Sequence, residues 1–102
     1  VLFRSWFGFP FTVSEDAGFT RNELTQYLEN KKIQTRTLFA GNIIKHPAFD
    51  EMRETGEGYR IVGELPVTDY VMNNTLWIGV FPGMTDSMLD YMIATIKEFC
   101  NR

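Results

Sequence analysis

Hydrophobic side chains occupy every second position in the first part of the chain, from Trp6 to Val13. Such alternation predicts a strand with one buried face. Pro10 lies in the middle of this segment, and a proline has no N–H to donate to a neighbouring strand. We therefore expect this strand at the edge of a sheet. The alternating apolar residues are Phe7, Phe9, Phe11 and Val13.

The pattern changes from strand to helix after a polar turn at residues 14–18. Thr20 is followed three residues later by Glu23, which is the spacing of a capping box at the start of a helix. Phe19 and Leu24 have the spacing of the hydrophobic staple that accompanies such a cap. We expect this helix to end near Lys31 and Lys32, whose charges suit a helix C-terminus.

The middle of the chain is punctuated by Gly, Pro and Asn and predicts only short elements. Thr68 is the expected N-cap of a helix of one or two turns, with Val67 and Met72 as its staple. The expected elements are a strand at 33–39, a break at 40–42, a short helix at 47–52, a polar loop at 54–58, an irregular stretch at 59–65, the helix through 73 and a strand at 76–81.

The last helix has the clearest pattern. Thr85 is its expected N-cap and Asp86 lies in its first turn. Apolar residues then recur at steps of three and four, which predicts a stripe that faces a core. The stripe consists of Met88, Leu89, Met92, Ile93, Ile96 and Phe99. The order strand–helix–strand, short helices, strand–helix predicts an α/β (α+β) domain in which a three-stranded sheet carries helices on one face.

Composition excludes several classes of function. The chain has 102 residues, enough for one domain, and a net charge of −3 with acids and bases interspersed, which argues against a nucleic-acid partner. No apolar run reaches the roughly 18 residues that a membrane span needs. Cys100 and His46 are the only residues of their types, so neither an internal disulfide nor a cysteine or histidine cluster is available, and a cytoplasmic location suits the chain. We treat residues 1–5 as a candidate non-native leader, because they match the translation of a common sequencing adapter, and residues 6–102 as the domain.

Three segments stand out after a search for catalytic and nucleotide-binding motifs finds none. The first is the aromatic run at 6–10 and the third is the strand–turn–helix junction at 75–85. The second, at 35–42, places Arg36 within a strand, where it either points to solvent or reaches a carboxylate or phosphate. The only histidine, His46, lies in a loop, where a solvent-facing or capping role is the simpler interpretation.

These three segments, in this order, resemble the small C-terminal domain of the DegT family of PLP- or PMP-dependent sugar-nucleotide aminotransferases and dehydratases. The resemblance covers nearly the whole chain and departs from the family pattern only at 52–58, where the chain is longer. The segments at 5–10, 35–42 and 72–79 look like the branch of CDP-4-keto-6-deoxy-D-glucose 3-dehydrases of lipopolysaccharide O-antigen biosynthesis. Aminotransferases of the family tend to carry a His where this chain has Phe7.

The resemblance implies a mainly antiparallel sheet of the aspartate-aminotransferase-like fold and a parent enzyme with a large cofactor-binding domain. PMP or PLP, a His in place of the usual Lys, and an iron–sulfur cluster where one exists would all belong to that large domain. We expect no cofactor, metal or catalytic residue in this chain, which would be inactive in isolation. The implied partners are a nucleotide-linked keto sugar, the large domain, a second subunit in a homodimer, and a flavin or iron–sulfur reductase.

The same resemblance implies substrate-binding residues in the first two segments: Phe7, Arg36, Phe39 and Asn42. Phe7 is either a wall for the sugar and the cofactor ring or an ordinary core residue. Two alternative functions remain open at this point. The chain could come from an aminotransferase of the same family, or it could be a free-standing ferredoxin-like interaction module, since a fold alone does not fix function.

Overall fold

The computed structural model describes residues 6–102, so the candidate leader at 1–5 lies outside the described residues. The elements are β1 (Gly8–Thr12), α1 (Arg21–Asn30), β2 (Thr35–Thr37), two 3₁₀ turns η1 (Ile43–Lys45) and η2 (Pro47–Phe49), α2 (Asp50–Thr55), α3 (Pro66–Asn74), β3 (Thr75–Gly79) and α4 (Asp86–Cys100). The predicted α/β order is confirmed.

The sheet has the strand order β1-β3-β2, and both pairings are antiparallel. Pro10 therefore lies on an edge strand, as its missing N–H predicts. Strand β2 is shorter than the predicted 33–39. The chain leaves the ladder because Leu38 begins a turn, closed by a hydrogen bond from the Gly41 N–H to the Leu38 carbonyl oxygen at 3.3 Å.

Local capping signals place the two long helices correctly. The Glu23 N–H donates to Thr20 Oγ1 at 3.2 Å and the Thr20 N–H donates to the Glu23 carboxylate at 2.7 Å, which completes the predicted capping box of α1. The Met88 N–H donates to Thr85 Oγ1 at 3.3 Å at the start of α4. Backbone donors that would otherwise be unpaired are thus satisfied at both helix starts.

The prediction for the helix before β3 is wrong at its start. Thr68 lies inside α3 and caps nothing, because Pro66 begins the helix and the Asp69 N–H already donates to the Leu65 carbonyl oxygen at 3.0 Å. A proline suits the first helical position, since the N–H it lacks would have had no partner there. Val67 is 73% exposed, so the predicted staple with Met72 is absent as well.

The core lies between the sheet and the two long helices. Its buried apolar residues are Val13, Leu24, Leu28, Ile33, Leu76 and Ile78. Only part of the predicted stripe of α4 packs there: Met92, Ile96 and Phe99 contact the core, whereas Met88, Leu89 and Ile93 are exposed. The stripe is therefore wider than the core that it meets, and the expectation that all of it is buried is wrong.

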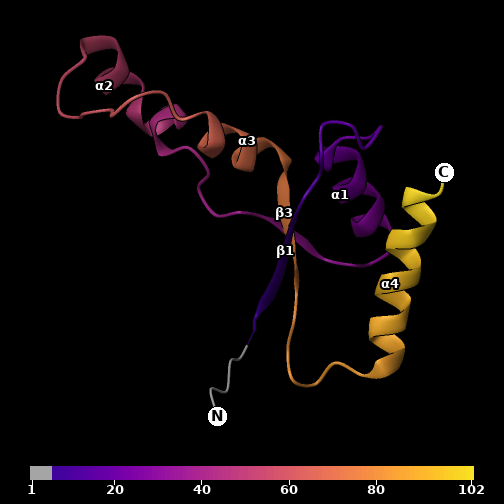
Figure 1. The fold of residues 1–102 in the computed structure, drawn as a ribbon. Helices are drawn as coiled ribbons and strands as arrows, with labels where there is room; N and C mark the ends of the chain where they lie inside the picture. The colour runs from indigo at the N-terminus through magenta and orange to yellow at the C-terminus, as the bar shows by residue number, and fades with distance from the viewer. Residues whose placement is uncertain (1–5) are drawn as a thin grey trace.

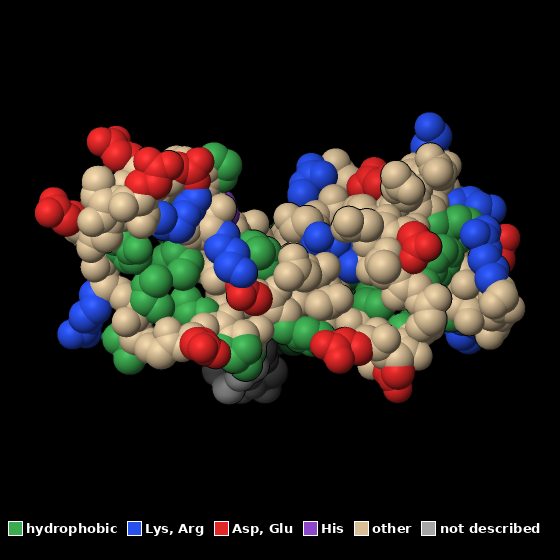
Figure 2. Space-filling model, turned by 90° about the horizontal axis from the view of Figure 1, so that it is seen from above, with side chains coloured by type: hydrophobic (Ala, Val, Ile, Leu, Met, Phe, Trp, Pro, Cys, Tyr) green, Lys and Arg blue, Asp and Glu red, His purple; other side chains and the backbone are tan. Residues whose placement is uncertain are grey.

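The molecule is elongated, with principal extents of 53 × 40 × 22 Å. Helices α1 and α4 lie on one side of the strands, and the segment that carries α2 and α3 extends the other way (Figure 1). Seen from above, acidic and basic side chains are interspersed, and hydrophobic side chains show at the α2 end (Figure 2). Among residues 6–102, no helix combines the length and the apolar character that crossing a membrane requires.

Candidate functional site

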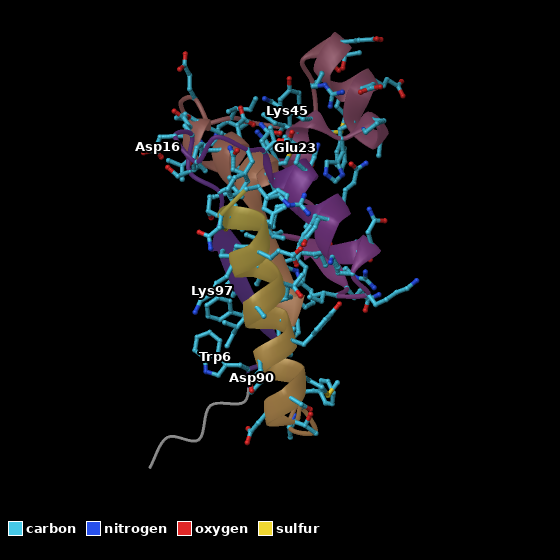
Figure 3. The ribbon with its side chains drawn as sticks, turned by 90° about the vertical axis from the view of Figure 1, so that its right-hand side faces the viewer. Trp6, Asp16, Glu23, Lys45, Asp90 and Lys97 are labelled. Atoms are coloured by element: carbon cyan, nitrogen blue, oxygen red, sulfur yellow. The ribbon has the colours of Figure 1, made fainter. Side chains whose placement is uncertain are left out.

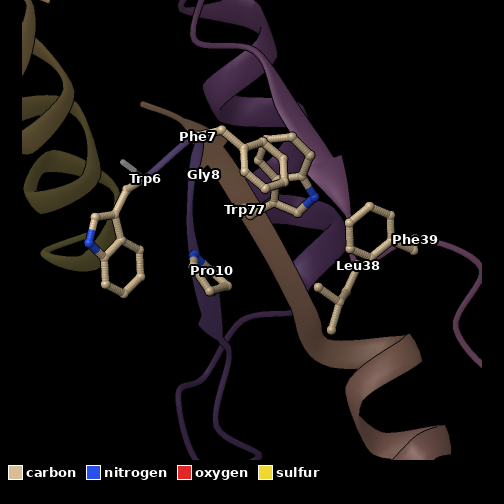
Figure 4. A pocket seen from close by; sticks show the side chains of 7 residues that line it. All are labelled: Trp6, Phe7, Gly8, Pro10, Leu38, Phe39 and Trp77. Carbon is tan, nitrogen blue, oxygen red and sulfur yellow. The ribbon is translucent and has the colours of Figure 1, made fainter. Parts of the chain in front are cut away.

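An aromatic hollow of about 550 Å³ lies on the sheet face that the long helices leave open. Strand β1, the central strand β3 and the turn after β2 all contribute to it (Figure 4). Register explains why they meet, because Pro10 and Arg36 are both paired with Trp77 and so share its face of the sheet. The lining residues are Trp6, Phe7, Gly8, Pro10, Leu38, Phe39 and Trp77.

Trp77 forms the floor of this hollow. Its indole N–H donates to the Thr37 carbonyl oxygen at 3.1 Å, which fixes the ring across β2. Phe7 meets the indole edge-on, with ring centroids 5.2 Å apart and an interplanar angle of 74°. Gly8 makes room for the ring, since a Cβ added there would lie 2.5 Å from Trp77 Cε3. An alanine or larger residue at position 8 would therefore displace the floor.

The hollow is an uncharged aromatic surface that can contact a ligand. Its lining residues offer aromatic faces and carry no charge, and the indole N–H of Trp77 already donates to Thr37. Such a surface suits the apolar face of a sugar or a flat heteroaromatic ring. It does not suit a phosphate, because none of the lining residues is Arg, Lys or a helix N-terminus. A PMP or PLP ring therefore fits against this hollow only if its phosphate is held by residues elsewhere.

The four residues expected to bind substrate separate into two pairs. Phe7 and Phe39 both line the hollow and are 66% and 75% exposed, so their rings are free to contact a ligand. Arg36 shares the sheet face of Trp77, but its guanidinium donates to the Thr35 carbonyl oxygen at 3.1 Å and does not line the hollow. Asn42 is 2% exposed and does not line the hollow.

Asn42 fixes the turn that presents Phe39. Its side-chain amide donates to the Asp69 carboxylate at 2.7 Å, and its backbone N–H donates to Met72 Sδ at 3.3 Å. Lys45 binds the second oxygen of Asp69 at 2.7 Å. Helix α3 thus holds the turn through one carboxylate. The hydrogen bonds from Lys45 and Asn42 keep the pKa of Asp69 below its ordinary value.

Low pH should weaken the hydrogen bonds by which Asp69 holds the turn that presents Phe39. A carboxyl whose pKa is lowered by folding contributes stability above its unfolded-state pKa, and that contribution disappears as the pH falls through the lower folded-state value. We expect Asp69→Asn to lower the melting temperature at neutral pH, and we expect this difference to disappear as the pH falls through the lowered pKa of Asp69. Thermal melts from pH 7 to pH 2 measure this, with Asp90→Asn on the exposed face of α4 as the control. An equal effect of Asp69→Asn at every pH would contradict the assignment.

Sequence reasoning missed Trp77 as a site residue. The signal was present, since Trp77 lies in the third distinctive segment and alternates out of phase with the core residues Leu76 and Ile78. Recognising it required the register, which brings Pro10 and Arg36 opposite Trp77 and is not visible in the strands taken singly.

The chain belongs to a known family. Residues 3–97 match the DegT/DnrJ/EryC1/StrS aminotransferase family, so the chain is a member of it. This match confirms the family that the three segments indicate. It begins at residue 3 and so includes part of the candidate leader.

Two individual proteins of known name are similar to this chain. The chain is 52% identical over 95 residues to dTDP-4-dehydro-2,6-dideoxy-D-glucose 3-dehydratase of Saccharopolyspora spinosa, covering 93% of this chain and 20% of that protein. It is 50% identical over 95 residues to lipopolysaccharide biosynthesis protein RfbH of Salmonella typhimurium, covering 93% and 21%. The chain thus spans about a fifth of the length of these relatives.

A solved structure shares the fold. The crystal structure of GDP-4-keto-6-deoxymannose-3-dehydratase with a trapped PLP-glutamate geminal diamine matches with a TM-score of 0.68 and 26% identity, over 89% of this chain and 22% of that one. The expected fold, a domain of the PLP-dependent class with a three-stranded antiparallel sheet, is therefore confirmed.

Proposed function

We propose that this chain is the C-terminal domain of a PMP-dependent 3-dehydrase that acts on a nucleotide-linked 4-keto-6-deoxy sugar in deoxysugar and lipopolysaccharide O-antigen biosynthesis. Its aromatic hollow forms one wall of the substrate cleft. The large domain of the same polypeptide supplies the opposite wall, the cofactor site and the catalytic residues. The domain therefore contributes binding and shape, and it is inactive in isolation.

The observation that carries this proposal is the position of the hollow. It joins all three segments that look like the 3-dehydrase branch: Phe7 comes from the first, Phe39 from the second and Trp77 from the third. Residues that are far apart in sequence thus meet at one exposed aromatic surface on the face without a helix layer. The two relatives that share about half of its residues, a 3-dehydratase and RfbH, support the same branch.

The role of the wall follows from its chemistry. When bound, PMP would supply the electron sink for removal of the C-3 hydroxyl group. Phe7 and Trp77 would lie against the sugar or the cofactor ring, exclude water and offer no competing proton donor, since the Trp77 N–H is engaged by Thr37. Phe39 extends the wall from the turn that Asn42 and Asp69 hold.

The direct test is the coding sequence upstream of this domain. We expect a large domain with His at the position where an aminotransferase has its PLP-binding Lys. A Lys in that position lets an aminotransferase hold PLP covalently, whereas a PMP-dependent dehydrase must avoid that bond and can use His as its proton acceptor. A Lys there would overturn the dehydrase proposal in favour of the aminotransferase, and the absence of a large domain would leave the interaction module.

A substitution in the full-length enzyme tests the wall itself. Phe7→Ala removes one exposed aromatic face, and such contacts contribute about 0.5–1.5 kcal/mol, so we expect kcat/KM for the keto sugar nucleotide to fall by a factor of about 2 to about 13. Phe81→Ala is the matched control, because Phe81 is 52% exposed and does not line the hollow. Equal activity of the two variants would show that the hollow does not contact substrate.

A further inference from the structure

The turn that follows β2 has a bulky residue where the backbone geometry favours glycine. The Gly41 N–H donates to the Leu38 carbonyl oxygen at 3.3 Å, which makes Phe39 and Ala40 the two central residues of the turn. Of these two, Phe39 alone has a positive φ, of 43°. A positive φ at the first central position is the mark of a type II′ turn, in which Gly is the usual residue there. Phe39 therefore has a strained backbone that a glycine would relieve.

The surroundings of the turn hold this strain in place. Gly41 lies so close to α3 that a Cβ there would overlap the side chain of Met72. The next residue, Asn42, is anchored to the same helix by its hydrogen bonds to Met72 Sδ and to the carboxylate of Asp69. Two successive residues are thus fixed against α3, and the turn cannot relax around Phe39.

The ring of Phe39 gives this chain little packing to offset the strain. It is 75% exposed, and among residues 6–102 it forms no aromatic pair, whereas Phe7 packs edge-on against Trp77. Figure 4 shows the Phe39 ring beside Leu38, apart from Phe7 and Trp77. Strained residues are concentrated at ligand contacts, where the position of a side chain matters more than its contribution to stability. The strain therefore points to a ligand of this ring.

Phe7 and Phe39 lie at different levels of the sheet. The Val80 N–H donates to the Phe7 carbonyl oxygen at 3.0 Å, so Phe7 lies beyond the last residue of β3. Phe39 follows Thr37, which is paired with Leu76 near the start of β3. These two levels are four residues apart, which is about 13 Å along a strand.

The side-chain view agrees with this separation. In Figure 3, Trp6, the neighbour of Phe7, lies toward the lower end of the molecule, and Lys45, four residues after the turn, lies toward the upper end. The aromatic hollow thus has one end at Phe7 and another at Phe39. A ligand that touches both rings is longer than a single sugar ring.

We propose that Phe39 binds the base of the nucleotide that carries the keto sugar, and that the strained turn presents its ring for stacking. The inference rests on the proposed function, in which Phe7 and Trp77 lie against the sugar or the cofactor ring. A nucleotide-linked sugar has a second flat group, the base, on the far side of its diphosphate. An exposed phenylalanine can stack on it, because every base has a π-face. Phe39 therefore determines affinity and takes no part in the chemical step.

Two substitutions that both remove the ring measure the strain. In the 102-residue chain, Phe39→Gly is expected to melt at least about 4 °C above Phe39→Ala, because Gly adopts a positive φ without strain and Ala does not. Lys32 is the matched control, since it has a φ of 63° at the end of α1 and does not line the hollow. Lys32→Gly should likewise melt above Lys32→Ala.

The same variants in the full-length enzyme test the stacking contact. Phe39→Gly and Phe39→Ala should both raise the inhibition constant of the best-binding nucleoside diphosphate among dTDP, CDP and GDP by about fivefold or more. KM for the sugar nucleotide should rise with it, while kcat stays within about twofold. Inorganic pyrophosphate, which has no base, should inhibit every variant equally. Phe39→Tyr retains the ring face and should retain the original constants, as should Lys32→Gly.

Three results would overturn the inference. Equal melting temperatures of Phe39→Gly and Phe39→Ala would show that the turn is not strained. A raised KM with unchanged inhibition by the nucleoside diphosphate would place the ring against the sugar or the cofactor. Unchanged KM and unchanged inhibition would show that the ring contacts no ligand. Failure of the proposed function is recognised separately, because Phe7→Ala tests the sugar wall and the Lys or His upstream distinguishes an aminotransferase from a dehydrase.

Discussion

Leu76→Ala is expected to lower the free energy of unfolding of the chain by roughly 2–5 kcal/mol, the range for a buried leucine whose cavity is not refilled. Leu76 lies on the central strand β3, is fully buried and packs in the core together with Leu28 and Val13. The buried core has few apolar residues, so each contributes a large part of the free energy of unfolding. In ordinary domains this free energy is about 5–15 kcal/mol.

Thermal or chemical unfolding of the 102-residue chain measures the effect. At about 4–8 °C for each kcal/mol in a domain of this size, the melting temperature should fall by at least about 8 °C. Ile93→Ala is the matched control: Ile93 is 51% exposed, and its truncation should lower the melting temperature only slightly. If the two substitutions had equal effects, the core would not lie where the structure places it.

The elements that the sequence predicts best are those specified by local chemistry. Thr20 with Glu23, and Thr85 before a periodic apolar run, determine helix starts through hydrogen bonds within one turn, and both helices begin where expected. Pro10 indicates an edge strand because the missing N–H acts in any fold. The prediction that Thr68 caps the helix before β3 is wrong because Pro66 starts that helix two residues earlier.

The burial of side chains was harder to predict, because it depends on which other elements pack against them. The periodicity of α4 shows that Leu89 and Ile93 belong to an apolar face, and it does not show which partner covers that face. The site has the same difficulty. Phe7 and Phe39 come from segments that are distinctive by themselves, whereas the inclusion of Trp77 and the buried position of Asn42 follow from strand register and from the carboxylate of Asp69.

Gly8→Ala and Gly79→Ala form a matched pair that probes the floor of the aromatic hollow. The two glycines are directly paired across β1 and β3. A Cβ at Gly79 meets nothing within 4 Å, whereas a Cβ at Gly8 would lie 2.5 Å from Trp77 Cε3 and 3.1 Å from Cζ3. We expect Gly8→Ala to lower the free energy of unfolding by about 1–3 kcal/mol, the range for overpacking, and Gly79→Ala to leave it nearly unchanged.

The displaced indole links this stability effect to function. Trp77 is held by its hydrogen bond to the Thr37 carbonyl oxygen and by its edge contact with Phe7, so a ring pushed away from Gly8 must lose one of the two. Either loss moves the floor of the hollow relative to Phe39 and changes the wall that faces the sugar. In the full-length enzyme, Gly8→Ala should therefore lower kcat/KM by about tenfold or more, which corresponds to about 1.4 kcal/mol of lost transition-state stabilisation. Gly79→Ala should retain activity. A Gly8→Ala enzyme with unchanged kcat/KM, in which tryptophan fluorescence shows that the indole has moved, would mean that the cleft does not use this hollow.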